Sequence, residues 1–340
     1  MLFEINKEQE TITRGLSEII QDKIGDGYIP FSQYMHFALY HPKYGYYNNF
    51  LYKFGPSGDY ITAPLVSELF GSSISMQIKE IFEKGVQPDI FEFGAGNAQL
   101  MLDILSNVGT LVNHYYVMEV SSSLALVQQQ RLIKEMPQFK DRVTWLTKLP
   151  QKFNGIIIGN EILDAIDCDI VYWNNGEIYS KVVTHKDGKF IFTEIKANKP
   201  ILDIAKTIHQ TENDYTSEVS PQRIGFINSI CEMLDCGVIL LIDYGYGEAQ
   251  YYSPSRSHGS IRGFFRQHQL DDVLIYPGLI DITSNVDFTA VAKAAIGNGL
   301  DLIGFTTQSV FLINCGIVEQ LEKKQISSSD VKYLQLTNGL

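Results

Sequence analysis

The residues best suited to chemistry form a glycine-rich segment, Phe91-Glu-Phe-Gly-Ala-Gly-Asn97, between an apolar run and a helical pattern. Gly94 and Gly96 let the backbone turn tightly and approach a ligand, and the N–H groups that open the next helix point toward it. A dinucleotide-binding turn would carry a third glycine where this chain has Gln99. Glu92, an acidic residue before the first glycine, instead favours an S-adenosylmethionine (SAM) site. Because glycine turns are also common structural devices, the segment alone leaves both interpretations open.

Glu119 supports a ligand site next to this turn. It ends an apolar strand pattern and lies 23 residues after Gly96. At that position a carboxylate can accept hydrogen bonds from both hydroxyls of a ribose. The alternative is a solvated glutamate at a strand end, but the combination with the glycine turn favours the ligand role.

Polar residues follow a further strand pattern in Gly159-Asn-Glu-Ile-Leu-Asp164. Residues just beyond the carboxyl ends of parallel strands line the ligand crevice, so we expect Asn160 and Glu161 where a methyl group is transferred. Asn160 or Asp164 could instead cap a helix, and for Asp164 the two roles are equally supported.

Three more aspartates are candidates for the same edge. Asp243 ends the most apolar strand pattern of the chain, residues 238–243, and could either reach the site or cap a turn. Asp281 and Asp287 are weaker candidates, and Asp287 has the position of a helix N-cap.

These residues require a scaffold that brings strand ends together, and the pattern predicts an α/β fold. Strand and helix patterns alternate from residue 88 to residue 159, which implies a parallel sheet with helices on both faces. We assign residues 86–340 to this Rossmann-like domain and residues 1–85 to an N-terminal helical region that could act as a lid. The alternation breaks over about residues 168–216, where Asn-Gly and Asp-Gly turns predict an antiparallel β insertion.

The remaining elements follow from apolar periodicity and helix-start residues. Helices are predicted over residues 4–24, 31–40, 97–107, 121–136, 220–234, 288–298 and 308–323, with another that starts at Thr62 and Pro64. Strands are predicted over residues 89–93, 114–119, 142–146, 155–159, 170–173, 179–184, 189–195, 238–243 and 300–305.

The composition excludes several classes of protein. The net charge of −12 argues against nucleic-acid binding, and no apolar run approaches the roughly 20 residues that span a bilayer. Four cysteines and seven histidines lack the spacing of metal ligands, so we predict no metal. The acidic first thirty residues argue against a transit peptide, and we therefore expect a cytoplasmic protein.

Several segments together resemble the MidA family, whose members include a mitochondrial complex I assembly factor. The resemblance runs in order along nearly the whole chain, although Leu65 and Ser284-Asn285 depart from the usual pattern and the C-terminal Phe-Lys signature of the family is absent. The matching segments are Tyr40-His-Pro-Lys-Tyr-Gly-Tyr-Tyr47, Gly58-Asp-Tyr-Ile-Thr-Ala-Pro64, Phe70-Gly71, Glu92-Phe-Gly-Ala-Gly96, Gly159-Asn-Glu-Ile-Leu-Asp-Ala165, Ile242-Asp-Tyr-Gly-Tyr246, Pro277-Gly-Leu-Ile-Asp-Ile-Thr283 and Val286-Asp-Phe288.

The resemblance implies a SAM-dependent methyltransferase that modifies arginine in a protein partner, with symmetric dimethylation as the expected product and a respiratory-complex subunit as one possible partner. Asn160 and Glu161 would line the reaction centre. The residues that would form the cofactor site are Glu92, Gly94, Gly96, Glu119, Thr62 and Pro64.

An arginine acceptor poses a chemical problem, because a guanidinium with a pKa above about 12 is protonated at neutral pH. Paired carboxylates can grip its N–H groups, orient the reacting nitrogen and stabilise the charge. Glu161 is the first candidate for this catalytic role, Asp243 the second, and Asn160 lies beside them. Four tyrosines could form a lid or a cation–π surface, or could merely pack over a core edge. They are Tyr40, Tyr44, Tyr46 and Tyr47.

Two other functions compete with an arginine methyltransferase. A SAM-binding assembly factor without catalysis would keep the same cofactor motif, so the sequence does not separate the two. An NAD-dependent oxidoreductase is disfavoured by Gln99 in place of the third glycine.

Overall fold

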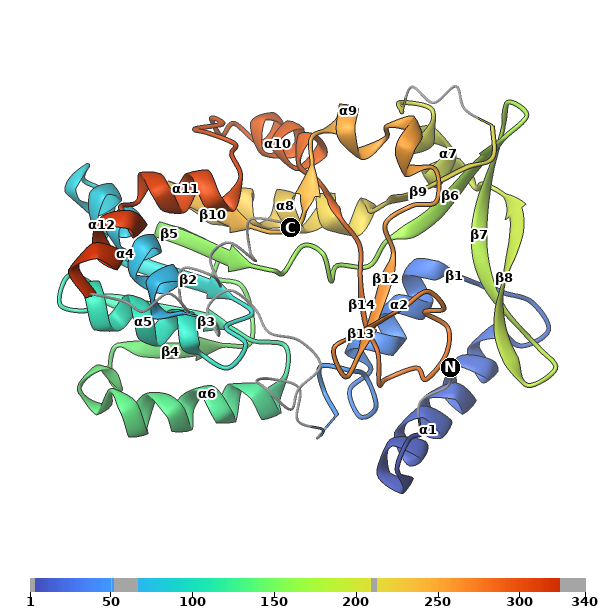
Figure 1. The fold of residues 1–340 in the computed structure, drawn as a ribbon, viewed down its shortest axis with the longest axis horizontal. Coiled ribbons are helices and arrows are strands. Elements are labelled where there is room, and N and C mark those ends of the chain that lie inside the picture. Colours follow the sequence, from blue (N-terminus) through green and yellow to red (C-terminus); the bar gives the residue numbers. More distant parts are fainter. Residues whose placement is uncertain (1–3, 50, 52–66, 209–212, 325–340) are drawn as a thin grey trace.

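A sheet of five parallel strands, in the order β10-β5-β2-β3-β4, forms the centre of the molecule (Figure 1). The computed structural model describes residues 4–49, 51, 67–208 and 213–324. Each sheet strand lies where the sequence predicts one, which confirms the α/β class. The strands are β2 (Asp89–Phe93), β3 (His114–Met118), β4 (Val143–Leu146), β5 (Phe153–Asn160) and β10 (Leu234–Ile242).

Helices cover both faces of this sheet, because alternate strand residues point to opposite sides and most are apolar. Ile90 and Ile156 are fully buried on one face, and Phe91 and Ile157 on the other. The first face packs against α4 (Glu68–Glu83), α5 (Gln99–Val108), α6 (Ser122–Glu135), α11 (Gln308–Asn314) and α12 (Ile317–Lys324), and the second against α8 (Pro221–Met233) and α10 (Phe288–Gly297).

The predicted antiparallel insertion forms a second sheet beside the first. Its two hairpins turn at Asn175-Gly176 and Asp187-Gly188, where all four residues have φ between +49° and +78°, as a two-residue primed turn requires. The sheet is built from β6 (Asp169–Asn174), β7 (Glu177–Lys186), β8 (Lys189–Lys196) and β9 (Tyr215–Val219), with α7 (Lys199–Ala205) before β9 and β1 (Ile29–Pro30) paired with β7.

The N-terminal helices pack against the insertion and a small three-stranded sheet. α1 (Lys7–Ile24) starts at a capping box between Asn6 and Gln9, and its buried residues share a core with α2 (Phe31–Tyr40). Because this core also includes residues of the insertion, the division of the chain at residue 85 stays a proposal. The small sheet consists of β12 (Arg262–Phe265), β13 (His268–Leu270) and β14 (Asp281–Thr283).

Short elements close the carboxyl edge of the central sheet. Asp287 caps α10 as predicted, since its Oδ1 accepts hydrogen bonds from the N–H groups of Thr289 and Ala290 at 3.0 and 3.1 Å. The other short elements of this edge are the parallel pair β11 (Gly245–Tyr246) and β15 (Val286–Asp287) and helix α9 (Glu248–Tyr251), followed by a 3₁₀ turn at Pro254–Arg256. A second 3₁₀ turn, Pro137–Phe139, connects α6 to the start of β4.

The predicted strand over residues 300–305 is wrong. Residues 301–307 are exposed and form no helix or strand, and the exposed fraction of Ile303 reaches 82%. A strand needs a neighbour for its backbone N–H and C=O groups. Within the described ranges, no strand pairs with this segment or with the outer edge of β10.

One predicted helix also needs correction. The helix over residues 308–323 is two helices, α11 and α12, because the chain bends at Gly316, whose φ of +78° is incompatible with a continuous helix. Helix α4 begins at Glu68, with the extended residue Ser67 as its N-cap. The predicted helix start at Thr62 and Pro64 lies outside the described residues.

A pair of glycines sets the distance between β5 and β10, and this generates a prediction. Gly237 pairs with Gly155, and a Cβ at Gly237 would lie 1.8 Å from the carbonyl oxygen of Gly155. We expect Gly237→Ala to lower the free energy of unfolding by more than about 2 kcal/mol in urea titrations, because the strands must separate. Gly225→Ala, at an exposed position of α8 with nothing within 4 Å, should instead raise it by roughly 0.5–1 kcal/mol. Equal effects of the two substitutions would contradict this account.

Candidate functional site

The glycine turn after β2 has a left-handed backbone. Gly94 and Gly96 have φ of +62° and +53°, and Ala98 has φ of +72° before α5 begins. The N–H of Gly94 donates to the carbonyl of Met118 on β3 at 3.0 Å. A Cβ on Gly94 would lie 3.0 Å from Ile162, so only glycine allows both this conformation and this close approach.

Two side chains of α6 hold this turn from outside. Gln128, which is fully buried, donates from Nε2 to the carbonyl of Gly96 and to Oε2 of Glu119, both at 2.9 Å. Arg131 donates to the carbonyl of Asn97 at 2.8 Å and to Gln99 Oε1 at 3.0 Å. Sequence reasoning missed Gln128 and Arg131. Their spacing of three residues on one helix face was the available signal, but polar residues on a surface helix usually face solvent.

Glu119 lies behind the turn. Its Oε1 accepts a hydrogen bond from the N–H of Ser121, the N-cap of α6, at 3.0 Å. Burial raises its pKa, while the hydrogen bonds from Ser121 and Gln128 lower it. Glu119 is not among the described residues that line the cavity presented below, so its contact with a ribose stays a prediction.

Glu92 is buried beneath the same turn. Its Oε2 accepts a hydrogen bond from the hydroxyl of Tyr115 at 2.8 Å. Burial raises the pKa of Glu92 to about 7, the hydrogen bond from Tyr115 opposes this, and the charge of Glu119 adds to it. The carboxyl group can therefore carry a proton near neutral pH and act as a hydrogen-bond donor.

The second half of the site is the loop after β5. Asp243, at the end of β10, accepts hydrogen bonds on Oδ2 from the N–H groups of Leu163 at 2.7 Å and Asp164 at 3.2 Å, and on Oδ1 from Tyr244 at 2.8 Å. Glu161 has φ of +51°, which is rare for a residue with a side chain and costs energy that the surroundings must supply. Asp243 thus holds the loop in a strained conformation, and its direct role in methyl transfer stays a prediction.

Three buried side-chain oxygen atoms from the end of β5 to the start of β6 have no hydrogen-bond partner in the described part of the chain, Oδ1 of Asn160, Asp164 and Asp167. Of these residues, Asn160 and Asp164 line the cavity described below. Asp164 caps no helix, because a turn rather than a helix follows it. A buried polar atom without a partner is costly, and at a cavity wall it marks a position where a ligand can bind.

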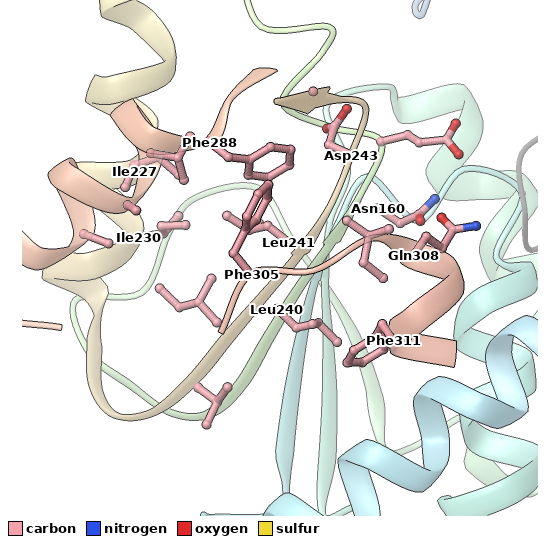
Figure 2. A pocket seen from close by; sticks show the side chains of 18 of the residues that line it. Asn160, Ile227, Ile230, Leu240, Leu241, Asp243, Phe288, Phe305, Gln308 and Phe311 are labelled. Carbon is pink, nitrogen blue, oxygen red and sulfur yellow. The ribbon is translucent and has the colours of Figure 1, made fainter. Parts of the chain in front are cut away.

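One cavity of about 2530 Å³ joins the turn and the loop. Figure 2 shows its polar end at Asn160 and Asp243, while Leu240, Leu241 and Phe305 lie along its apolar part. The apolar part follows β10 toward residues 300–311. The predicted site residues that line the cavity are Glu92, Gly94, Gly96, Asn160, Glu161 and Asp243.

The four tyrosines divide between the two roles left open by the sequence. Tyr46 is buried in the N-terminal core, so its role is packing. Tyr47 lines the cavity, donates to Oδ1 of Asp281 at 2.9 Å, and stacks on Tyr40 with ring centroids 5.4 Å apart. The hydroxyl of Tyr40 donates to the carbonyl of Ala165 at 2.9 Å. Tyr44 stacks on His41 in the same turn.

The donor set fits a SAM-type cofactor. The left-handed glycines leave a path for a ligand along the end of β2, and buried carboxyl groups lie beside it at Glu92 and Glu119. The unpartnered oxygen of Asn160 faces the same cavity and could accept a hydrogen bond from a ligand amino group. In the described ranges, no group of three His, Cys, Asp or Glu side chains could hold a metal ion.

Comparison with known proteins agrees with this geometry. The profile of a family of S-adenosyl-L-methionine-dependent methyltransferases matches residues 72–306. A Burkholderia thailandensis protein, solved with S-adenosyl-homocysteine (SAH) bound, is 31% identical with a TM-score of 0.91 over 98% of this chain and 88% of that one. The protein arginine methyltransferase NDUFAF7 homolog of Caenorhabditis elegans is 28% identical over 92% of this chain and 78% of its own length, and NDUFAF7 of Danio rerio is 28% identical over 93% and 79%.

The Caenorhabditis elegans and Danio rerio relatives are named as mitochondrial proteins, which contradicts the prediction of a cytoplasmic protein. That prediction rested on acidic N-terminal residues and the absence of a signal pattern, which describe the segment but do not determine a compartment. In the described part of the chain, no helix combines the length and apolar character needed to cross a membrane.

The role of Gln128 can be tested by substitution. Gln128→Ala removes the bridge between Glu119 and the glycine turn, so we expect the affinity for SAH to fall about tenfold in calorimetric titration. Gln130→Ala, at an exposed position of the same helix, is the matched control and should leave affinity unchanged. Unchanged affinity in Gln128→Ala would show that the turn keeps its conformation without this bridge.

The buried Glu92 should make stability depend on pH. Between its ordinary pKa of 4.5 and its folded pKa of about 7, the folded protein holds a proton that the unfolded chain has lost. Stability from this group is therefore present below pH 4.5 and is lost as pH rises to about 7. In urea titrations of the ligand-free protein, the difference in unfolding free energy between wild type and Glu92→Gln should change by about 1 kcal/mol per pH unit in this window. If the unfolding free energies of wild type and Glu92→Gln changed in parallel with pH, the raised pKa of Glu92 would be refuted.

Proposed function

The chain belongs to the MidA family of SAM-dependent methyltransferases, and from that premise we propose that it methylates arginine side chains of a protein partner. The Caenorhabditis elegans and Danio rerio relatives are named protein arginine methyltransferases, and they match this chain over more than nine-tenths of its length. The family resemblance favours symmetric dimethylarginine as the product. It also makes a respiratory-complex subunit the acceptor that we propose.

The observation that carries this proposal is the charge at the polar end of the cavity. Four carboxyl groups face one another there, and each of the other three raises the pKa of Asp164. The nearby guanidinium of Arg223 donates to the carbonyls of Leu163 and Asn285 and to the hydroxyl of Ser284, so it forms no hydrogen bond with them. A cavity with this excess of negative charge favours a cationic ligand. The four groups are Glu161, Asp164, Asp243 and Asp281.

The residues at this end can manage the chemistry of a guanidinium. When bound, SAM supplies an electrophilic methyl group on a sulfonium. The residues that would hold SAM are Glu92, Gly94, Gly96 and Glu119, with Asn160 at the junction of the two halves. Glu161 would orient the acceptor nitrogen and stabilise its positive charge, because carboxylate–guanidinium pairs are strong and directional. Its strained backbone supports a functional role.

Methyl transfer can be measured directly. The purified protein is incubated with tritium-labelled SAM and a respiratory-membrane extract, and the acid hydrolysate is separated for methylated amino acids. We expect label in symmetric dimethylarginine. Gly94→Val should abolish both labelling and SAH binding, because a side chain cannot fit against Ile162 at this φ. Glu161→Gln should lower labelling about 100-fold with SAH affinity unchanged.

A matched control and two contrary results complete this test. Glu177→Gln, at the exposed first residue of β7, removes a carboxylate that is not part of the cavity lining and should label like wild type. Labelling that survives in Glu161→Gln would rule out its catalytic role. SAH binding without methylated arginine would instead favour a cofactor-binding assembly factor.

A further inference from the structure

Asp164 is a carboxylate of the cavity wall that has an oxygen atom without a hydrogen-bond partner among the described residues. Its exposed fraction is 5%, it lines the cavity, and its Oδ1 has no hydrogen-bond partner in the described ranges. Its own N–H donates to Asp243 and its carbonyl accepts from the N–H of Ser284 at 3.0 Å. The backbone of Asp164 is thus held by hydrogen bonds at both its N–H and its carbonyl. Its buried carboxyl group keeps one oxygen that can accept a hydrogen bond from a ligand.

The surroundings of this carboxyl group are negative. Its neighbours are Asp243 after β10, Asp281 on β14 and Glu161 in its own loop, and only Arg223 of α8 opposes them. The guanidinium N–H groups of Arg223 donate instead to neutral oxygens, the carbonyls of Leu163 and Asn285 and the hydroxyl of Ser284. Among residues 4–49, 51, 67–208 and 213–324, no cationic side chain forms a salt bridge or hydrogen bond with the Asp164 carboxyl group.

Asp281, the first residue of β14, also lines the cavity. Its Oδ1 accepts a hydrogen bond from Tyr47 at 2.9 Å, and Tyr47 stacks on Tyr40 at an interplanar angle of 28°. The hydroxyl of Tyr40 bonds the carbonyl of Ala165, so the aromatic pair is tied to the residue that follows Asp164. A planar cation between the two carboxyl groups would also lie beside an aromatic ring, which favours guanidinium.

Resting on the proposed function, we infer that Asp164 and Asp281 bind the guanidinium of the arginine acceptor, with Asp243 as a positioning residue. Asp243 is unsuited to that contact because its two oxygens already accept three backbone N–H groups. Asp164 presents an unpartnered oxygen, and a guanidinium offers five N–H donors in a fixed plane. This assignment adds two carboxylates to Glu161 and gives Asp243 a structural role.

Binding of a guanidinium beside Asp164 should change the protonation of its carboxyl group. Burial, then the charges of Asp243, Asp281 and Glu161, raise the pKa of Asp164 well above its ordinary value, which favours its protonated form when no cation is bound. A bound guanidinium stabilises the carboxylate and so favours release of a proton. Acceptor affinity should therefore rise with pH over the range in which Asp164 ionises. The titratable and charged groups that interact with Asp164 are Glu161, Arg223, Asp243, Asp281, Tyr40 and Tyr244.

The test is calorimetric titration of the SAH-saturated protein with Nα-acetyl-arginine N-methylamide, run in phosphate and in Tris at one pH. We expect wild type to bind this probe in the millimolar range and to release a fraction of one proton, seen as a difference in enthalpy between the buffers. Asp164→Asn should bind the probe about 10- to 100-fold more weakly, without proton release and with SAH affinity unchanged.

Two controls separate binding from folding. Asp167→Asn removes a carboxylate three residues away that pairs with His36 and does not line the cavity, so it should bind the probe like wild type. Asp164→Asn should melt no lower than wild type at neutral pH, because it removes a buried group whose ionisation opposes folding. The lysine analogue of the probe should bind more weakly than the arginine probe, since its ammonium is not planar.

The outcomes distinguish this inference from the proposed function. Equal probe binding by wild type and Asp164→Asn, or no probe binding by an SAH-saturated wild type, overturns the role of Asp164. Failure of the proposed function is seen separately, as the absence of labelled arginine in the transfer assay. A loss of probe binding in Asp164→Asn that is accompanied by loss of SAH binding also overturns the inference, because the substitution then acts on the whole cavity.

Discussion

The carboxylate of Asp243 is the interaction on which the site depends. It accepts the N–H groups of Leu163, Asp164 and Tyr244, and thereby joins the end of β10 to the loop after β5. That loop carries Asn160, Glu161 and Asp164 to one cavity wall. Without the three hydrogen bonds, the strained backbone at Glu161 would relax and the carboxyl groups would separate. Burial raises the pKa of Asp243 to about 6, and its three N–H donors oppose that rise, so the contact that organises the loop also keeps its anion stable.

The same edge of the sheet concentrates unfavourable energy. Glu92 and Asp164 are buried, Asp243 is half-buried, and the pKa of each of the three carboxyl groups is raised. A protein selected for stability alone would replace such groups with apolar residues of similar size. Their combination with unpartnered oxygens and a left-handed glutamate is typical of a binding site whose ligands satisfy these groups. The energetic cost of these buried carboxyl groups and the capacity of the site to bind a cofactor and a cation thus have one cause.

Each half of the site is held by an element that the sequence places far away. Gln128 and Arg131 of α6 fix the glycine turn, and Tyr40 and Tyr47 of the N-terminal region close the opposite side. The strand positions, the two hairpin turns and the cap at Asp287 could be predicted because they follow from local periodicity and local backbone chemistry. The strand predicted over residues 300–305 failed because apolar alternation does not say whether a partner strand is present.

The sequence by itself determined the α/β class, the glycine turn, and the identity of the polar residues that end β3, β5 and β10, because each depends on residues adjacent in the chain. Only the tertiary structure decided which of those residues hold the loop and which present a free hydrogen-bonding atom to a ligand. Asp243 and Asp164 are both aspartates after apolar strands, yet one is saturated by backbone N–H groups and the other has an unpartnered oxygen in the cavity. Hydrogen-bond saturation depends on which distant N–H groups arrive in three dimensions, and no spacing along the chain encodes it.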